Sequence, residues 1–246
     1  MSYFLLSKEA TAGKEVILRG EEARHLGYAR RAYPGEEVKV QDTQGRRFAA
    51  QVLKVARNEV RLQILQEIEV PPESPLKIAL FQALIAEQAL DYILQKSTEL
   101  GVTEIYLFPS EHSPYHFVGE RLVKKFTRWQ RICEEAAKQC ERAKIPEVQF
   151  VADPERLKEK LTQYAARVIL HPGAEQSLTA FLRAQNTLSS VGVVVGPEGG
   201  FSAQEVEILK NAPNVQVVHL GGRILRTETA VSCALALAQA IHGDLQ

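Results

Sequence analysis

Two glycine-containing segments near the C-terminus have the composition of ligand-binding loops. Gly196-Pro197-Glu198-Gly199-Gly200 follows the apolar run Val193–Val195, and Leu220-Gly221-Gly222-Arg223-Ile224-Leu225-Arg226 follows further along the chain. Glycine leaves backbone N–H groups unshielded by a Cβ atom, and open α/β sheets bind their ligands where the strands end. We therefore expect both segments to form one composite binding pocket.

Two charged residues in these segments are candidates for chemistry. Glu198 lies between a proline and a glycine, which places its carboxylate on an exposed turn. Arg226 precedes a predicted helix, where a cation opposes the positive N-terminal end of the helix dipole. Arg226 is therefore expected to reach a ligand, an anion or a carboxylate such as Glu198. Neighbouring polar residues have structural explanations: Thr227 as the N-cap of that helix, and Ser202 with Glu205 as a capping box.

A third loop, Leu170-His171-Pro172-Gly173, also follows an apolar run. His171 suits a turn as well as it suits catalysis. Neither GxGxxG nor GxxxxGK[S/T] occurs in the chain, so the fingerprints of dinucleotide and nucleoside triphosphate binding are absent.

Alternating strands and helices must position the three loops. Short apolar runs separated by helical patterns predict a mostly parallel sheet that is covered on both faces. The expected strands are 76–83, 104–109, 148–151, 167–170 and 191–195, and the expected helices are 87–100, 121–144, 177–185, 203–211 and 228–242.

The first seventy or so residues have a different pattern, in which apolar and polar residues largely alternate. This alternation predicts half-buried strands, and their short spacing indicates a small β-barrel. The expected strands are 16–19, 37–41, 47–53 and 60–65, with a helix at 21–29 and a positive φ at Gly45 in the turn 42–45. Pro71–Pro75 is the best domain boundary, which gives domains 1–72 and 73–246.

Composition narrows the class of protein. The 246 residues include 30 basic and 30 acidic side chains, so no overall field favours nucleic acid. Three cysteines without a CxxC pair indicate free thiols rather than a metal site. No membrane span or secretory leader is recognised, so we expect a cytoplasmic protein. Residues 121–144 carry eight basic against three acidic residues, which fits a solvated helix face or a surface that follows phosphates.

Four segments together resemble one known family. The 196–202 and 220–230 segments resemble the signature pair of the bacterial small-subunit ribosomal RNA uridine-N3 methyltransferases, which belong to the SPOUT class. Gln95–Val102 resembles the QKxTELGV element of that family. The 128–146 segment, which contains Arg128-Trp129-Gln130-Arg131-Ile132, resembles its RWxxI…EAAxQxxR…P helix.

The resemblance implies a fold, a cofactor and partners. It implies an N-terminal PUA-like RNA-binding β-barrel and a C-terminal SPOUT α/β domain with a mostly parallel sheet and a trefoil knot. S-adenosylmethionine would bind the knot loops, the C-terminal domain would form a homodimer, and 16S rRNA in the small ribosomal subunit would be the substrate; no metal is implied. The cofactor positions carried over are Leu170, His171, Gly173, Gly196, Glu198, Gly199, Leu220, Gly221, Ile224 and Leu225.

The chain departs from the family pattern at positions that would face RNA or substrate. Arg24-His25-Leu26, Ala86–Ala89 and Glu111-His112-Ser113 replace the usual His-His-Leu, Lys-Gly-Asp/Glu-Arg and Glu-Arg-Ser. The RNA-binding candidates are Arg24, His25, Arg30, Arg31, Lys124 and Arg128, and the catalytic candidates are Arg226 and Glu198.

The residues suit the expected reaction. The N3 proton of uracil must leave before that nitrogen attacks a methyl group, so a base or an anion stabiliser is needed. Glu198 could orient the uracil or accept its N3 proton, and Arg226 could stabilise negative charge on the uracil oxygens. The alternatives are a catalytically silent RNA-binding module of the same fold, which would have no cofactor affinity, and a small-molecule α/β enzyme, which leaves the barrel and the basic helix unexplained.

Overall fold

The structure is a computed structural model that describes residues 3–113 and 119–245. The chain divides into two compact units. The first unit comprises residues 1–73 together with 137–144, and the second comprises 74–136 and 145–246. Each unit has its own hydrophobic core.

The first unit contains a five-stranded sheet in the order β1-β3-β4-β5-β2. All neighbouring pairs are antiparallel except β1 and β3. Its elements are β1 (Phe4–Leu5), β2 (Glu15–Arg19), α1 (Gly20–Arg24), the π-helix η1 (His25–Ala29), β3 (Glu37–Gln41), β4 (Arg47–Val55) and β5 (Glu59–Ile68). The alternating pattern of the sequence places Val38, Val40 and Phe48 in the core, and Gly45 has the expected positive φ of 80°.

The second unit contains seven parallel strands in the order β10-β12-β9-β11-β6-β7-β8. Its strands are β6 (Lys77–Ala83), β7 (Val102–Phe108), β8 (Glu147–Phe150), β9 (Ala166–Leu170), β10 (Gln176–Ser177), β11 (Ser190–Val195) and β12 (Val215–His219). The remaining helices are α2 (Glu87–Glu99), α3 (Gly119–Gln139), α4 (Pro154–Leu161), α5 (Leu178–Arg183), α6 (Ala203–Lys210) and α7 (Thr227–His242).

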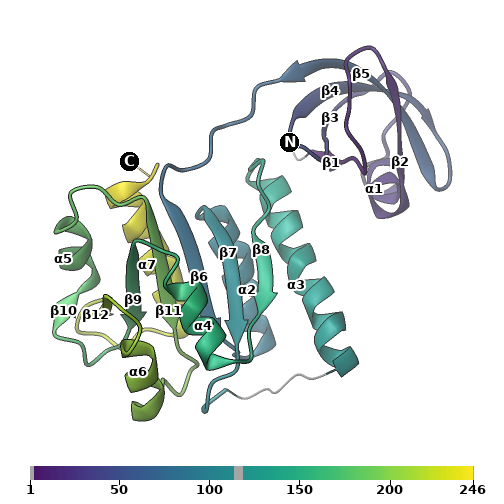
Figure 1. The fold of residues 1–246 in the computed structure, drawn as a ribbon. Coiled ribbons are helices and arrows are strands. Elements are labelled where there is room, and N and C mark those ends of the chain that lie inside the picture. The colour runs from purple at the N-terminus through teal and green to yellow at the C-terminus, as the bar shows by residue number, and fades with distance from the viewer. Residues whose placement is uncertain (1–2, 114–118, 246) are drawn as a thin grey trace. The chain divides into compact units, whose positions relative to one another are not determined.

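Helices cover both faces of this parallel sheet, as the sequence predicts (Figure 1). Side chains alternate along the central strand β6: Ile78 and Leu80 belong to one core cluster, and Ala79 and Phe81 to another. The first cluster includes residues of α2, α3, α5 and α7, whereas the second includes residues of α4 and α6. The site therefore stands on a sheet that is buried on both sides.

Two local predictions are wrong. The helix expected over 121–144 ends at Gln139, and Glu141 has a φ of 60°. The carbonyl groups of 141–143 accept hydrogen bonds from the side chains of Arg47 and Gln41 instead of continuing a helix. Thr227 is not the N-cap of α7, because Arg226 occupies that position and caps with no side-chain hydrogen bond. Thr227 is the first helical residue and is buried.

Candidate functional site

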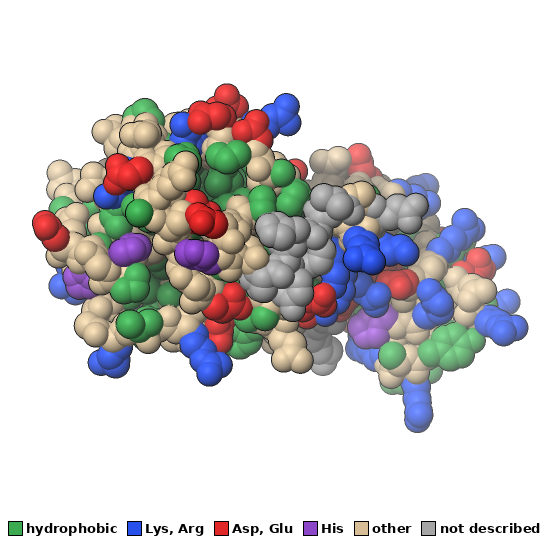
Figure 2. Space-filling view, turned by 90° about the horizontal axis from the view of Figure 1, so that it is seen from below, with side chains coloured by type: hydrophobic (Ala, Val, Ile, Leu, Met, Phe, Trp, Pro, Cys, Tyr) green, Lys and Arg blue, Asp and Glu red, His purple; other side chains and the backbone are tan. Residues whose placement is uncertain are grey.

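The carboxyl ends of β9, β11 and β12 border a cavity of about 940 Å³ in the second unit. The loops that follow these strands form its walls, together with the first turns of α2 and α7. Figure 2 views this edge of the sheet and shows histidine and hydrophobic side chains gathered there. The three loops that the sequence singled out therefore meet at one place.

The loop after β11 is shaped by two glycines. A Cβ atom at Gly196 would lie 3.2 Å from the ring of Phe201, so the absence of a side chain lets that ring lie against the backbone. Gly200 has a φ of 74°, which side chains disfavour, and its N–H donates to the carbonyl of Pro197. Phe201 lines the cavity and stacks on Phe108 with their centroids 6.3 Å apart. The glycines thus permit a tight turn beside the cavity.

Glu198 joins this turn to α2. Its Oε1 accepts a hydrogen bond of 3.1 Å from the backbone N–H of Ala86, the N-cap residue of α2. The carboxylate therefore lies at the positive end of that helix, where a negative charge is favourable. Glu198 has a positioning contact within the chain and is not paired with Arg226.

The same turn is fixed from the other side by the loop after β7. Glu205 accepts from the backbone N–H of Ser202 at 2.9 Å, which completes the expected capping box, and from that of Glu111 at 2.9 Å. The Nδ1 atom of His112 lies 3.0 Å from the carbonyl oxygen of Gly200. Since a carbonyl can only accept, that nitrogen must carry the proton. Burial raises the pKa of Glu205, but its hydrogen bonds outweigh that effect and hold the pKa below its ordinary value.

The loops after β9 and β12 share one local device. His171 Nδ1 accepts from the N–H of Gly173 at 3.1 Å, and His219 Nδ1 accepts from the N–H of Gly221 at 2.9 Å. Gly221 has a φ of 111°, a conformation that an L side chain rarely adopts. Each histidine ring therefore holds a tight glycine turn at the end of its strand, which explains His171 as a turn residue.

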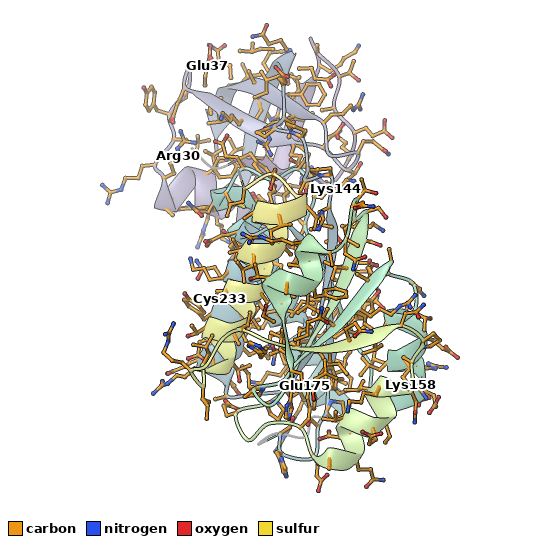
Figure 3. The ribbon with its side chains drawn as sticks, turned by 90° about the vertical axis from the view of Figure 1, so that its left-hand side faces the viewer. Arg30, Glu37, Lys144, Lys158, Glu175 and Cys233 are labelled. Carbon is orange, nitrogen blue, oxygen red and sulfur yellow. The ribbon has the colours of Figure 1, made fainter. Side chains whose placement is uncertain are left out.

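Arg226 contributes an exposed cation to the lining of the cavity. Its side chain is exposed, lines the cavity, and has no hydrogen bond or ion pair within the described ranges 3–113 and 119–245. Its carbonyl oxygen accepts from the N–H of Ala230 at 2.8 Å, which begins α7. In Figure 3, the label Cys233 identifies α7, the helix that follows Arg226, and the label Glu175 identifies the loop after β9. The cation therefore remains available to a bound molecule.

Most of the cofactor positions carried over from the family surround this cavity, and two do not. The cavity is lined by Leu170, His171, Gly196, Glu198, Leu220, Gly221, Ile224 and Leu225. Gly173 and Gly199 are not among its lining residues. A Cβ atom at Gly199 would lie 3.0 Å from the Cβ of His112, so this glycine permits packing between two loops.

The sequence did not single out all of the lining residues. Ala86, Gln88, Ala89 and Tyr92 reach the cavity from α2, and His219 reaches it from the end of β12. For His219 a local signal existed, because His-x-Gly occurs at 171–173 and again at 219–221. Ala86, Gln88 and Ala89 lie in the segment 86–89, which the family resemblance placed facing RNA or substrate. Tyr92 carried no such signal, since only the fold brings its side of the helix to the loops.

The RNA-binding candidates differ in exposure and in whether their charges are paired. In the first unit, Arg24 and Arg31 are exposed, and the ring of His25 packs edge-on against Phe4 at 5.6 Å. Arg30 forms an ion pair with Glu36 at 3.0 Å.

In the second unit, Lys124 is exposed, whereas Arg128 makes a bidentate ion pair with Asp91 of α2. Lys125, on the same helix, pairs with Glu87. Two of the basic side chains of α3 are therefore paired with carboxylates of α2.

The described residues include no group of three or more His, Cys, Asp or Glu side chains placed to hold a metal ion. Among the helices of the described ranges, none combines the length and the apolar composition that a bilayer requires.

Known proteins resemble this chain in both sequence and fold. The RNA methyltransferase domain family matches residues 72–239. The ribosomal RNA small subunit methyltransferase E of Aquifex aeolicus is 32% identical over 226 residues, which cover 91% of this chain and 93% of that protein. The protein of the same name from Mycobacterium bovis is 31% identical over 227 residues, with coverage of 91% and 85%.

Two solved structures have nearly the same fold. The ribosomal RNA small subunit methyltransferase E of Neisseria gonorrhoeae, bound to S-adenosylmethionine, is 33% identical with a TM-score of 0.88 and covers 100% of both chains. A methyltransferase from Legionella pneumophila, in complex with the same cofactor, is 31% identical with a TM-score of 0.91 and covers 99% of this chain and 98% of that one. The similarity extends over both units of the chain.

Proposed function

Because this chain belongs to the family of ribosomal RNA small subunit methyltransferases E, we propose that it transfers a methyl group from S-adenosylmethionine, held in the cavity at the strand ends, to 16S rRNA. The protein is an S-adenosylmethionine-dependent rRNA methyltransferase. The observation that carries the proposal is the meeting of three strand-end loops around one cavity.

The residues present fit this cofactor. The cavity of about 940 Å³ falls within the usual range for small-molecule sites. Leu170, Leu220 and Leu225 offer apolar surface for the adenine ring. The carboxylate of Glu228, in the first turn of α7, lines the same cavity and supplies negative charge for a sulfonium cation.

We propose uridine N3 as the methylated atom. The cofactor supplies an electrophilic methyl group, and the chain must orient the uracil in line with it and favour the deprotonated ring. Arg226 is the residue placed for the second task, since its guanidinium is exposed at the cavity and unpaired within the part of the chain that the structure describes. Glu198 acts by positioning the turn against α2.

The finer features of the family are also proposals. The five-stranded sheet of the first unit supports a PUA-like barrel, and three loops that converge after β9, β11 and β12 support a trefoil knot. We propose a homodimer through the second unit, supported by Ile224, which is 87% exposed beside the cavity although it is fully apolar. We propose that the protein acts in the cytoplasm, because its proposed substrate is ribosomal RNA.

A matched pair of glycines tests the site. Gly221 lines the cavity with a φ of 111°, whereas Gly222 has open space where a Cβ would lie, no positive φ, and no place in the lining. Gly221→Ala strains the turn that His219 holds, and we expect affinity for S-adenosylmethionine to fall about tenfold or more. Gly222→Ala should bind like the unaltered protein.

Titration calorimetry measures both affinities, and transfer of a labelled methyl group to small subunits from a strain lacking this protein measures the activity. Label recovered in 3-methyluridine supports the proposed atom. Label in a different nucleoside refutes it, and an unaltered protein that binds no cofactor refutes the site and favours a silent RNA-binding module.

A further inference from the structure

The first unit has an exposed surface that the cofactor site does not explain. It is formed by α1, η1 and the loop that leads to β3. Residues 23–35 include Arg24, Arg30 and Arg31 but no acidic residue. The same segment exposes two aromatic side chains, Tyr28 at 58% and Tyr33 at 65%. Figure 2 shows Lys and Arg side chains gathered around hydrophobic ones on this unit.

The helix that carries Tyr28 is fixed firmly to the sheet. Leu26 is fully buried, and a Cβ atom at Gly27 would lie 3.0 Å from Cγ1 of Val55, so the helix backbone packs directly on the end of β4. Because Leu26 and Gly27 face the core, Tyr28 is held on the outside. Residues 25–29 form a π-helix, a geometry that is rare and often found at functional sites.

A single carboxylate fixes the loop that carries Tyr33. Glu36 Oε1 pairs with Arg30 at 3.0 Å, and its Oε2 accepts from the N–H of Tyr33 at 3.3 Å. The Arg30 guanidinium also lies over the ring of Phe4, with 5.9 Å between Cζ and the ring centroid (Figure 3 labels Arg30). The charge of Arg30 is therefore used inside the unit. This residue positions the loop.

Two other arginines on this surface remain uncommitted. Arg24 and Arg31 are exposed, and neither has an ion pair within the ranges that the structure describes. Arg31 also has a φ of 57°, which is uncommon for a residue other than glycine. The surface thus presents two exposed rings and two free cations on a rigid support.

We propose that Tyr28 and Tyr33 stack on unpaired bases of the rRNA, while Arg24 and Arg31 contact the neighbouring phosphates. This inference rests on the proposed function and specifies how the substrate is recognised. Exposed aromatic rings beside cations suit single-stranded nucleic acid, because every base has a face that can stack and every nucleotide carries a phosphate. Duplex RNA hides its base faces and would leave both rings unused. Such a surface would select an rRNA loop or a partly unfolded region.

The test compares substitutions that keep or remove the rings. Tyr28→Ala with Tyr33→Ala should weaken binding to small ribosomal subunits at least tenfold, because each stacked base is lost. Tyr28→Phe with Tyr33→Phe should bind within twofold of the unaltered protein. Leu53→Ala, at a residue of the same unit that is 38% exposed, is the matched control and should change nothing.

Salt dependence separates the rings from the cations. The Tyr→Ala pair should keep the salt slope of binding, whereas Arg24→Gln and Arg31→Gln should each lower it by about one. A 12-nucleotide single strand should bind more weakly to the Tyr→Ala pair, and a duplex of the same length should bind both proteins equally. Melting temperatures confirm that each variant is folded.

Three results would overturn the inference. Subunit binding by the Tyr→Ala pair within twofold of the unaltered protein would exclude stacking. An equal loss in the Tyr→Phe pair would show that the hydroxyl groups, and not the rings, make the contact. If the Tyr→Ala pair binds RNA as well as the unaltered protein does but no longer binds a protein of the ribosomal subunit, the surface would be assigned to a protein partner. Failure of the proposed function is distinct, because the unaltered protein would then methylate no rRNA at all.

Discussion

Replacing Arg226 by glutamine separates a catalytic cation from a structural one. The side chain is exposed and has no ion pair within residues 3–113 and 119–245, and its structural contact is made by the backbone carbonyl, which any substitution keeps. Arg226→Gln therefore removes a charge but no hydrogen bond seen in the structure. We expect the variant to fold and to bind S-adenosylmethionine with an affinity within a few-fold of the unaltered protein.

The size of both effects follows from where this cation lies. Arg226 precedes the positive end of α7, so its loss relieves a repulsion that is worth about 0.5 kcal/mol for an exposed group. The melting temperature should stay constant or rise by roughly 1–2 °C. If the guanidinium stabilises negative charge on uracil, the rate should fall about a hundred- to thousandfold, or about 3–4 kcal/mol.

Single-turnover methylation with saturating cofactor and small subunits measures the step in question. Arg183→Gln is the control, since Arg183 is an exposed arginine at the end of α5 and does not line the cavity. Its rate should equal that of the unaltered protein. A lowered melting temperature for Arg226→Gln, with a rate within a few-fold of normal and a large drop in cofactor affinity, would show that the arginine is structural and would refute the reasoning.

Three further outcomes are expected. The folded-state pKa of Glu205 lies below its ordinary value of about 4.5, so the ionised side chain stabilises the fold above that pH, and this stabilisation is lost as the pH falls. In acid unfolding curves, Glu205→Gln should not show this loss of stability. Burial raises the pKa of Tyr3 to about 12, so its contribution to stability should be lost as the pH rises from 10 to 12. Burial also raises the pKa of Tyr106 and Tyr164, so Tyr3→Phe should reduce the decline in alkaline unfolding curves without abolishing it. Lys124→Gln should lower the salt slope of subunit binding by about one, whereas Arg128→Gln, which breaks the pair with Asp91, should lower stability by up to about 1 kcal/mol.

The sequence predicted the positions of the three cavity loops because their signals are local. An apolar run that stops at a glycine turn marks the end of a buried strand, and 170–173, 196–200 and 220–226 all show it. Asp153-Pro154 was an equally local signal for the start of α4, since Asp153 accepts from the N–H of Glu155 as an N-cap, yet no helix was expected there.

Contacts between distant residues could not be predicted in the same way. Arg128 pairs with Asp91, 37 residues away, so part of the positive charge that α3 has in sequence is paired in the fold. Arg47 bonds to the carbonyl of Arg142, 95 residues away, and this contact helps to end the α3 segment early. The engagement of Glu198 with Ala86, 112 residues away, likewise needs the sheet that brings β11 beside β6.

The central claim is that this chain methylates a uridine of 16S rRNA with a cofactor held at the strand ends. Mass spectrometry of 16S rRNA nucleosides from a strain that lacks the protein tests it most directly. We predict that one 3-methyluridine disappears in that strain, that the unaltered protein restores it, and that Arg226→Gln, expressed at an equal level, restores little of it. An unchanged 3-methyluridine content in the strain lacking the protein would contradict the account.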